Sequence, residues 1–212
     1  MIFLLKDSPF PDVTQADGDG LLAIGKDLSA ASLLEAYNQG IFPWYQEGEP
    51  ILWWNPDPRM VLFLHEFKVS KSLKQTLRKN TFKTTFNQSF ERVIDYCSKT
   101  SRKGQKGTWI SKEMKEAYVQ LHHLGHAVSV EAWQENKLVG GLYGIDLPDK
   151  KVFCGESMFH HTTDASKVAF YALVESLKQK NYRLVDCQVY TSHLESLGAR
   201  EIDRSMFLEY LK

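Results

Sequence analysis

Two strand-like segments separated by a helical stretch constrain the fold of this chain most strongly. Residues 153–159 and 185–189 are rich in the aromatic and β-branched residues that favour strands. Between them, Asp164 can cap a helix that runs through Lys178. Strands joined through a crossover helix pair in parallel within one sheet. The sequence therefore predicts a parallel strand pair, with strands over Lys151 to Met158 and Arg183 to Val189.

A hairpin is expected immediately before this unit. From Ala127 to Trp133 apolar and polar residues alternate, which predicts a half-exposed strand. Glu135 and Asn136 form the turn, and residues 138–145 return as the partner strand. The order is hairpin, strand, crossover helix and strand, which is the core order of the acetyltransferase-like (GNAT-type) fold. We therefore predict an α+β chain with a mixed sheet.

The first part of the chain has a different composition and predicts a separate domain. Residues 1–60 are rich in Gly, Pro and Trp, and a boundary is expected near residues 56–58. The predicted division is a small N-terminal domain over residues 1–58 and an acetyltransferase-like domain over residues 59–212. Within the small domain, Ser29 or Asp27 can cap a helix that ends at Gly40.

Composition narrows the class of protein. Lys plus Arg and Asp plus Glu both number 26, so global charge gives no argument for a nucleic-acid or membrane partner. The apolar start of the chain ends at Lys6, too early for a signal peptide or membrane span, which favours a cytoplasmic protein. The three cysteines are widely spaced and form no C-x-x-C pair, so a disulfide framework is not expected. No cysteine or carboxylate stands at metal-ligand spacing from the histidines, so a metal site is not expected either. A monomer is expected.

Glu156 and Asp186 stand in segments that otherwise read as buried strands. Burying either carboxylate unpaired would cost several kcal/mol. One interpretation places both at solvated strand ends. The other makes them part of a functional site, because sequences break local rules mainly where function requires it.

Tryptophans and a basic helix provide two further candidates. Trp44 follows a proline in a short loop, so its ring either packs in a core or offers a stacking surface, whereas Trp53 and Trp54 are expected in the core. Ser70 can cap a helix over residues 71–79, in a window without acidic residues. This helix is either a solvated face or a polyanion contact, with a possible second contact at Arg102, Lys103 and Lys106. The candidate contact residues on the helix are Lys71, Lys74, Arg78 and Lys79.

Six motifs, in order along nearly the whole chain, resemble those of the bacterial leucyl/phenylalanyl-tRNA-protein transferases. They occupy residues 19–25, 40–44, 52–59, 107–110, 153–159 and 186–189. The resemblance implies an enzyme that moves Leu or Phe from aminoacyl-tRNA to the N-terminal amine of proteins beginning with Arg or Lys, which marks them for degradation under the N-end rule. It implies no cofactor.

The resemblance also assigns roles to individual residues. Trp44 and Trp109 would hold the terminal adenosine, and Glu156, Asp186 and Gln188 would form the polar catalytic centre. An apolar pocket would hold the side chain of the transferred amino acid. Its residues would be Phe153, Met158, Val185, Leu142 and Leu173, of which the two leucines stand where the family pattern has Met and Phe.

The chemistry needs neither a metal nor an acyl-enzyme, because the ester of aminoacyl-tRNA is already activated. Asp186 can act as base or polariser, directly or through Gln188, and Glu156 can orient the amine or the ribose. A thiol nucleophile at Cys154 or Cys187 is disfavoured, since no His is predictably adjacent. Two other functions stay open. They are an acetyl-CoA-dependent N-acetyltransferase, although residues 160–167 lack the expected glycine, and a non-catalytic RNA-binding module.

Overall fold

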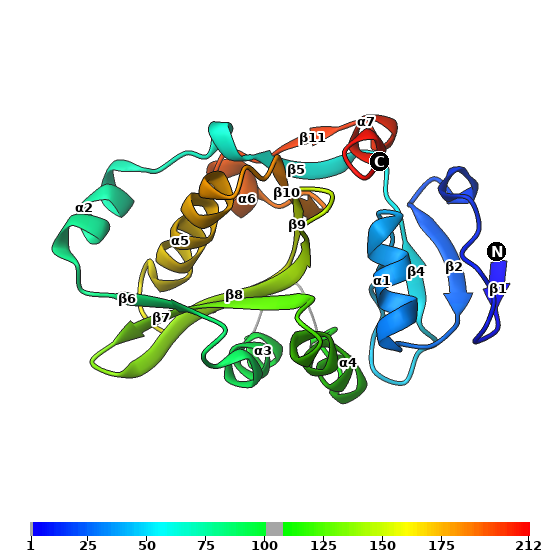
Figure 1. The fold of residues 1–212 in the computed structure, drawn as a ribbon, viewed down its shortest axis with the longest axis horizontal. Coiled ribbons are helices and arrows are strands. Elements are labelled where there is room, and N and C mark those ends of the chain that lie inside the picture. The colour runs from blue at the N-terminus through cyan, green and yellow to red at the C-terminus, as the bar shows by residue number, and fades with distance from the viewer. Residues whose placement is uncertain (1, 101–107) are drawn as a thin grey trace.

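The computed structural model describes residues 2–100 and 108–212, and their strands form two sheets (Figure 1). The small sheet has the strand order β1-β2-β4-β3 and comes entirely from the N-terminal part of the chain. Its β1 and β2 are parallel, whereas β4 is antiparallel to both β2 and β3. The strands are β1 (Ile2–Leu4), β2 (Leu21–Gly25), β3 (Phe42–Pro43) and β4 (Leu52–Trp54).

Helix α1 (Ala30–Asn38) follows β2 and begins where the sequence predicts. The hydroxyl of Ser29 accepts a hydrogen bond from the backbone N–H of Ser32, which satisfies one of the free donors at the helix start. The helix stops before Gly40, whose φ of 74° favours glycine. A Cβ at Gly40 would come within 2.9 Å of the Phe207 ring, so a close approach of the C-terminal part also requires glycine there.

The large sheet has the strand order β11-β5-β10-β9-β8-β7-β6. Strands β7, β8 and β9 form an antiparallel meander, and β9 pairs in parallel with β10. The predicted hairpin, strand, crossover helix and parallel strand are therefore confirmed, and so is the α+β class. The strands are β5 (Arg59–Phe63), β6 (Lys83–Phe86), β7 (Ala127–Gln134), β8 (Lys137–Leu147), β9 (Val152–His160), β10 (Leu184–Gln188) and β11 (Arg200–Ile202).

Helices cover both faces of this sheet. In Figure 1, α5 (Ala165–Gln179) lies on one side of β7 and β8, and α3 (Phe90–Lys99) and α4 (Lys112–His123) lie on the other. Helix α4 also lies beside α1, so the small N-terminal part packs against the large sheet and its helices. The remaining helical segments are η1 (Val13–Gln15), η2 (Leu64–Glu66), α2 (Lys71–Lys79), α6 (Ser192–Ser196) and α7 (Arg204–Glu209).

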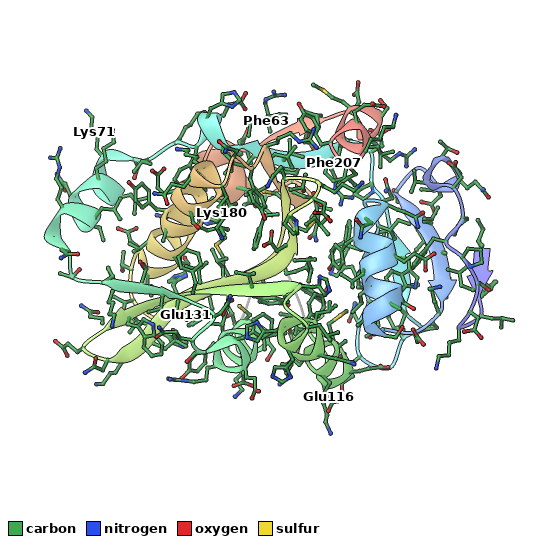
Figure 2. The ribbon with its side chains drawn as sticks, in the orientation of Figure 1. Phe63, Lys71, Glu116, Glu131, Lys180 and Phe207 are labelled. Atoms are coloured by element: carbon green, nitrogen blue, oxygen red, sulfur yellow. The ribbon has the colours of Figure 1, made fainter. Side chains whose placement is uncertain are left out.

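The prediction that β7 is half-exposed is wrong. Glu131 and Ser129, which were expected to face solvent, are both fully buried. The reason is that α5 packs on one face of β7 while α3 and α4 cover the other. Glu131, which is labelled in Figure 2, is accommodated because Thr85 and Ser129 donate hydrogen bonds to its carboxyl group, at 2.6 Å and 2.5 Å.

Asp164 occupies the N-cap position of α5 as predicted, but its side chain does not cap the helix. Its φ of 65° is left-handed, and its side chain accepts no hydrogen bond from the first turn of the helix backbone. The carboxylate instead accepts hydrogen bonds from Thr76 of α2 and Lys167 of α5. The Asp164 side chain therefore links α2 to α5 instead of capping α5.

Candidate functional site

A cavity of about 690 Å³ opens where β9 and β10 separate. The parallel register of these strands ends at Cys154 and Asp186, so Glu156 and Gln188 lie just beyond the paired part. Both of these polar side chains line the cavity. Separation of two neighbouring strands leaves room for a ligand in the middle of a sheet without removing core residues on either side.

The Glu156 carboxyl group is surrounded by hydrogen-bond donors. Its Oε1 accepts from the Tyr37 hydroxyl at 2.7 Å and from Gln188 Nε2 at 2.9 Å, and its Oε2 accepts from the Tyr118 hydroxyl at 3.0 Å. The two tyrosine hydroxyl oxygens also lie within hydrogen-bond distance of each other; because the two phenols have only two protons between them, the third contact of this triangle requires the proton of Glu156. Tyr37 belongs to α1 and Tyr118 to α4, so the small N-terminal part supplies a residue to this network.

Burial raises the pKa of Glu156 to about 7, although hydrogen bonds from Tyr37, Tyr118 and Gln188 favour the ionised form. The pKa values of both tyrosines lie well above the usual value, first because of burial and then because of the Glu156 charge. Both phenols therefore stay protonated and act as donors at neutral pH. Glu156 exchanges its proton near neutral pH, the range that suits a group taking part in proton transfer.

Asp186 does not line the cavity. It is 1% exposed, and Arg59, also 1% exposed, donates to it through Nε at 2.8 Å and Nη2 at 2.7 Å. Its Oδ1 additionally accepts the backbone N–H of Gln188 at 2.9 Å. The carboxylate is therefore not part of the cavity wall, and it fixes the backbone that presents Gln188.

Gln188 has an unusual backbone conformation. Its φ is 66°, in the left-handed region that residues with a Cβ seldom adopt, and the β10–β5 register shifts between Asp186 and Gln188. Such conformations cost on the order of 1–3 kcal/mol and persist where surrounding contacts enforce them. Here the bulge directs the Gln188 side chain toward Glu156 in the cavity.

The apolar residues predicted for the amino-acid pocket all line the same cavity. They come from three neighbouring strands, β8 to β10, and from α5, and Phe170 of α5 joins them. Met158 is partly exposed and the others are buried, as expected for the wall of a pocket that holds an apolar side chain. The predicted residues are Leu142, Phe153, Met158, Leu173 and Val185.

Trp44 and Trp109 also line the cavity, together with Phe42 and Pro43. Trp44 is 38% exposed, so its ring offers a surface rather than filling a core. Trp53 is fully buried, which confirms its expected core position. Trp54 is only partly buried; it packs against the core and donates a hydrogen bond to the backbone oxygen of Trp44, which helps to hold that loop.

The neighbouring thiols are unsuited to nucleophilic chemistry. Burial, and next the Asp186 charge, raises the pKa of the Cys154 thiol well above its usual value, and the same causes raise that of Cys187. Cys187 lines the cavity, and Cys154 is 1% exposed. Both stay protonated at neutral pH, when a nucleophile would need the thiolate.

Helix α2 has the residues and cap that the sequence predicts. Ser70 Oγ accepts the backbone N–H of Leu73, and Leu73 is buried while the basic side chains are exposed; Figure 2 shows Lys71 directed away from the rest of the molecule. Arg102, Lys103 and Lys106, the predicted second basic contact, and Gly107 lie outside the described residues. The exposed basic residues of α2 are Lys71, Lys74, Arg78 and Lys79.

Comparison with known proteins identifies the family. The family "Leucyl/phenylalanyl-tRNA protein transferase" matches residues 61–212, and its N-terminal domain matches residues 26–57. The chain belongs to the leucyl/phenylalanyl-tRNA-protein transferase family. Relatives of that name include one from Christiangramia forsetii, 57% identical over 211 residues, with 100% of both chains covered. Another, from Flavobacterium johnsoniae, is 59% identical and covers 100% of this chain and 99% of its own.

Among solved structures, an aminoglycoside acetyltransferase from a soil metagenome resembles part of the chain. It is 17% identical, covers 56% of this chain and 84% of its own, and has a TM-score of 0.43. Within residues 2–100 and 108–212 there is no helix long and apolar enough to cross a membrane. The same part of the chain contains no group of three or more His, Cys, Asp or Glu side chains arranged to hold a metal ion.

Sequence reasoning did not find three members of the site. Arg59 ends one of the six motifs but has no predicted role, and the sequence predicts no role for Tyr37 or Tyr118. A buried carboxylate requires hydrogen-bond donors or a counter-charge, so Asp186 and Glu156 must have such partners. The sequence does not indicate which residues these partners are. The partners of Glu156 are 119 and 38 positions away along the chain.

Proposed function

We propose that the protein transfers Leu or Phe from aminoacyl-tRNA to the N-terminal amine of proteins that begin with Arg or Lys, which marks these proteins for degradation. Family membership makes the chain an aminoacyltransferase. The observation that carries the proposal is the cavity itself. It combines an apolar pocket, the polar pair Glu156 and Gln188, and exposed tryptophan surface in one volume of about 690 Å³.

Each part of the cavity fits one part of an aminoacyl-adenosine. The pocket formed by Leu142, Phe153, Met158, Leu173 and Val185 suits a bulky apolar side chain such as that of Leu or Phe. The rings of Trp44 and Trp109 suit stacking with an unpaired base, such as the terminal base of a single-stranded RNA end. Glu156 and Gln188 lie on the adjoining strands and suit the ester and the incoming amine.

The reaction needs one bond exchange. The neutral amine attacks the ester carbonyl, the C–N bond forms, the C–O bond to ribose breaks, and the ribose oxygen takes up a proton as the amine nitrogen loses one. We propose that the Gln188 amide oxygen accepts a hydrogen bond from the amine, because its Nε2 is already engaged with Glu156. Glu156, with a pKa of about 7, orients the amine or the ribose and can hold the proton during the exchange.

Asp186 acts through Gln188 in this proposal. Its carboxylate is occupied by Arg59 and by the Gln188 backbone N–H, so it polarises and positions Gln188 without touching substrate. The strained backbone of Gln188 supports this role, since a bulge needs such a contact to persist.

We further propose that residues 1–58 and 59–212 are the two domains and that the protein works as a cytoplasmic monomer. The separate sheets support the division, with β4 ending at Trp54 and β5 starting at Arg59. The donor of the proposed reaction is made in the cytoplasm, which supports the location. Basic residues on α2 would bind the tRNA backbone.

Transfer of labelled Leu and Phe from their tRNAs to a peptide beginning with Arg tests the acceptor. The expected result is one residue added to the Arg peptide and to a Lys peptide, and none to an Ala peptide or to an Arg peptide with an acetylated N-terminus. Equal transfer to the Ala peptide would overturn the acceptor assignment.

A further inference from the structure

One end of the cavity carries basic side chains that the proposed reaction does not use. His160 at the end of β9, Lys167 in α5 and His193 in α6 all line it, together with the hydroxyl groups of Thr163 and Thr191. The Lys167 side chain is 35% exposed, and His160 and His193 are both exposed residues. These side chains therefore form an open rim that a ligand can reach.

The rim contains an ion pair, because Asp164 also lines the cavity and pairs with Lys167. The Lys167 ammonium group lies 3.1 Å from Asp164, whose other carboxylate oxygen accepts a hydrogen bond from Thr76. The pKa of His193 is lowered by burial first, then by the charges of Lys167 and His160, so the basic groups act on one another. An anion placed among them would accept hydrogen bonds from Lys167 and the threonine hydroxyls, and it would favour the protonated form of His193.

The rim adjoins the basic helix. Thr76 lies on α2, and its hydroxyl donates to Asp164 at 2.9 Å, at the start of α5 (Figure 1). Lys74 and Arg78 of α2 are exposed on the same short helix. Basic side chains therefore occur both on α2 and at the adjoining entrance of the cavity.

We propose that His160, Lys167 and His193 form a phosphate subsite for the single-stranded end of the donor RNA. The subsite binds the phosphodiester that joins the terminal adenosine to the preceding nucleotide. This inference rests on the proposed function, because it gives the donor a path from α2 into the cavity. Phosphate contacts of this kind fix the register of a nucleic acid without reading its sequence.

The test compares two minimal donors that differ by one phosphodiester. One is the leucyl ester of adenosine, and the other is the leucyl ester of cytidylyl-adenosine. Lys167→Met should raise the KM of the dinucleotide donor about 10- to 100-fold, the range for one charged hydrogen bond. The KM of the adenosine donor and that of the acceptor peptide should stay within about twofold, since neither contacts this rim. Lys167→Arg should restore most of the affinity.

Lys178→Met is the matched control. Lys178 lies on the same helix and also pairs with a carboxylate three positions earlier, Glu175, at 2.9 Å, but it does not line the cavity. Lys178→Met should leave the KM of both donors unchanged. His193→Gln is a second variant at the rim. It should raise the KM of the dinucleotide donor and leave that of the adenosine donor unchanged.

Binding gives a readout that does not depend on transfer. Isothermal titration of unesterified cytidylyl-adenosine and of adenosine should show tighter binding of the dinucleotide by wild type, and loss of that advantage in Lys167→Met. If wild type shows the advantage but transfers Leu from neither donor, the subsite stands and the proposed function fails. Equal loss for both ligands, a changed KM only for the acceptor peptide, or no dinucleotide advantage in wild type would each overturn the subsite.

Discussion

Arg59 and Asp186 form a fully buried, two-pronged ion pair beside the strand residues that line the cavity, with N–O distances of 2.8 Å and 2.7 Å. The Arg59 guanidinium lies between the rings of Phe42, at 4.9 Å, and Phe207, at 4.6 Å. Phe42 belongs to the small sheet and Phe207 to the C-terminal helix α7. This pair therefore connects both ends of the chain to the strand that carries Gln188.

Asp186→Ala should lower turnover by on the order of 10²-fold or more while aminoacyl-tRNA binding changes little. The reason is that Gln188 loses the carboxylate that fixes its backbone. The same change leaves Arg59 buried without a counter-charge, which should cost about 3–5 kcal/mol of stability. Turnover is therefore measured well below the melting temperature of the variant, with donor binding measured in parallel.

Arg59→Lys provides the matched control for this pair. Lysine keeps the charge but cannot make the two-pronged contact, so turnover should fall less than in Asp186→Ala. Near-normal turnover in Asp186→Ala would remove Asp186 from the mechanism.

The stability of the wild-type protein should contain a pH-dependent contribution from Glu156. Its pKa rises from an ordinary value of 4.5 to about 7, so the folded state binds more protons than the unfolded state between these values. By linkage, this contribution is fully present below about pH 4.5 and is lost as the pH rises to about 7. Its size should be on the order of 3 kcal/mol.

Urea unfolding of wild type and Glu156→Gln at several pH values between those limits measures this contribution. The amide cannot ionise, so the stability difference between wild type and variant should shift against wild type as pH rises. A difference that stays constant with pH would contradict the assigned pKa.

Trp44→Ala and Trp109→Ala should each weaken binding of a non-hydrolysable leucyl-adenosine analogue by roughly 1–3 kcal/mol, because each removes a ring that stacks on the base. Phe at either position should restore part of the affinity. Trp133→Ala is the control, since Trp133 lies on β7 and does not line the cavity. Variants that melt earlier but bind the analogue normally would assign both tryptophans to the core.

Alanine at Lys71, Lys74, Arg78 or Lys79 should weaken binding of full-length aminoacyl-tRNA. Each substitution should also reduce the slope of log affinity against log salt by somewhat under about 1, because one phosphate contact is lost. Transfer from a leucyl-adenosine donor, which has no distant phosphates, should hardly change. Lys112→Ala on α4, also an exposed lysine, should affect neither donor.

Equal effects of the α2 substitutions on both donors would indicate a disturbed fold. No effect on either donor would make α2 an ordinary solvated helix.

Local signals accounted for what the sequence predicted correctly. Ser29 and Ser70 cap helices as expected because capping depends on neighbours within three residues. The turn at Glu135 and Asn136 forms with φ values of 49° and 60°, as a tight hairpin turn requires. The parallel pair followed from the crossover helix.

What the sequence did not predict depends on distant contacts. The alternation of apolar and polar residues in β7 predicted an exposed face for Glu131, but α3 and α4 cover that face. Asp164 resembled a cap, but Thr76, 88 positions away, and Lys167 bind its side chain. Arg59 and Asp186 are 127 positions apart, so only the fold brings them together.

The most direct test of the account offers the enzyme both possible donors at once. Purified protein is incubated with leucyl-tRNA, acetyl-CoA and an Arg-initiated peptide, and the product is identified by mass spectrometry. The account predicts that the peptide gains one leucyl residue at its N-terminus, and that Glu156→Gln and Asp186→Ala slow this reaction. A peptide that gains an acetyl group instead, or remains unmodified while leucyl-tRNA is bound, would contradict it.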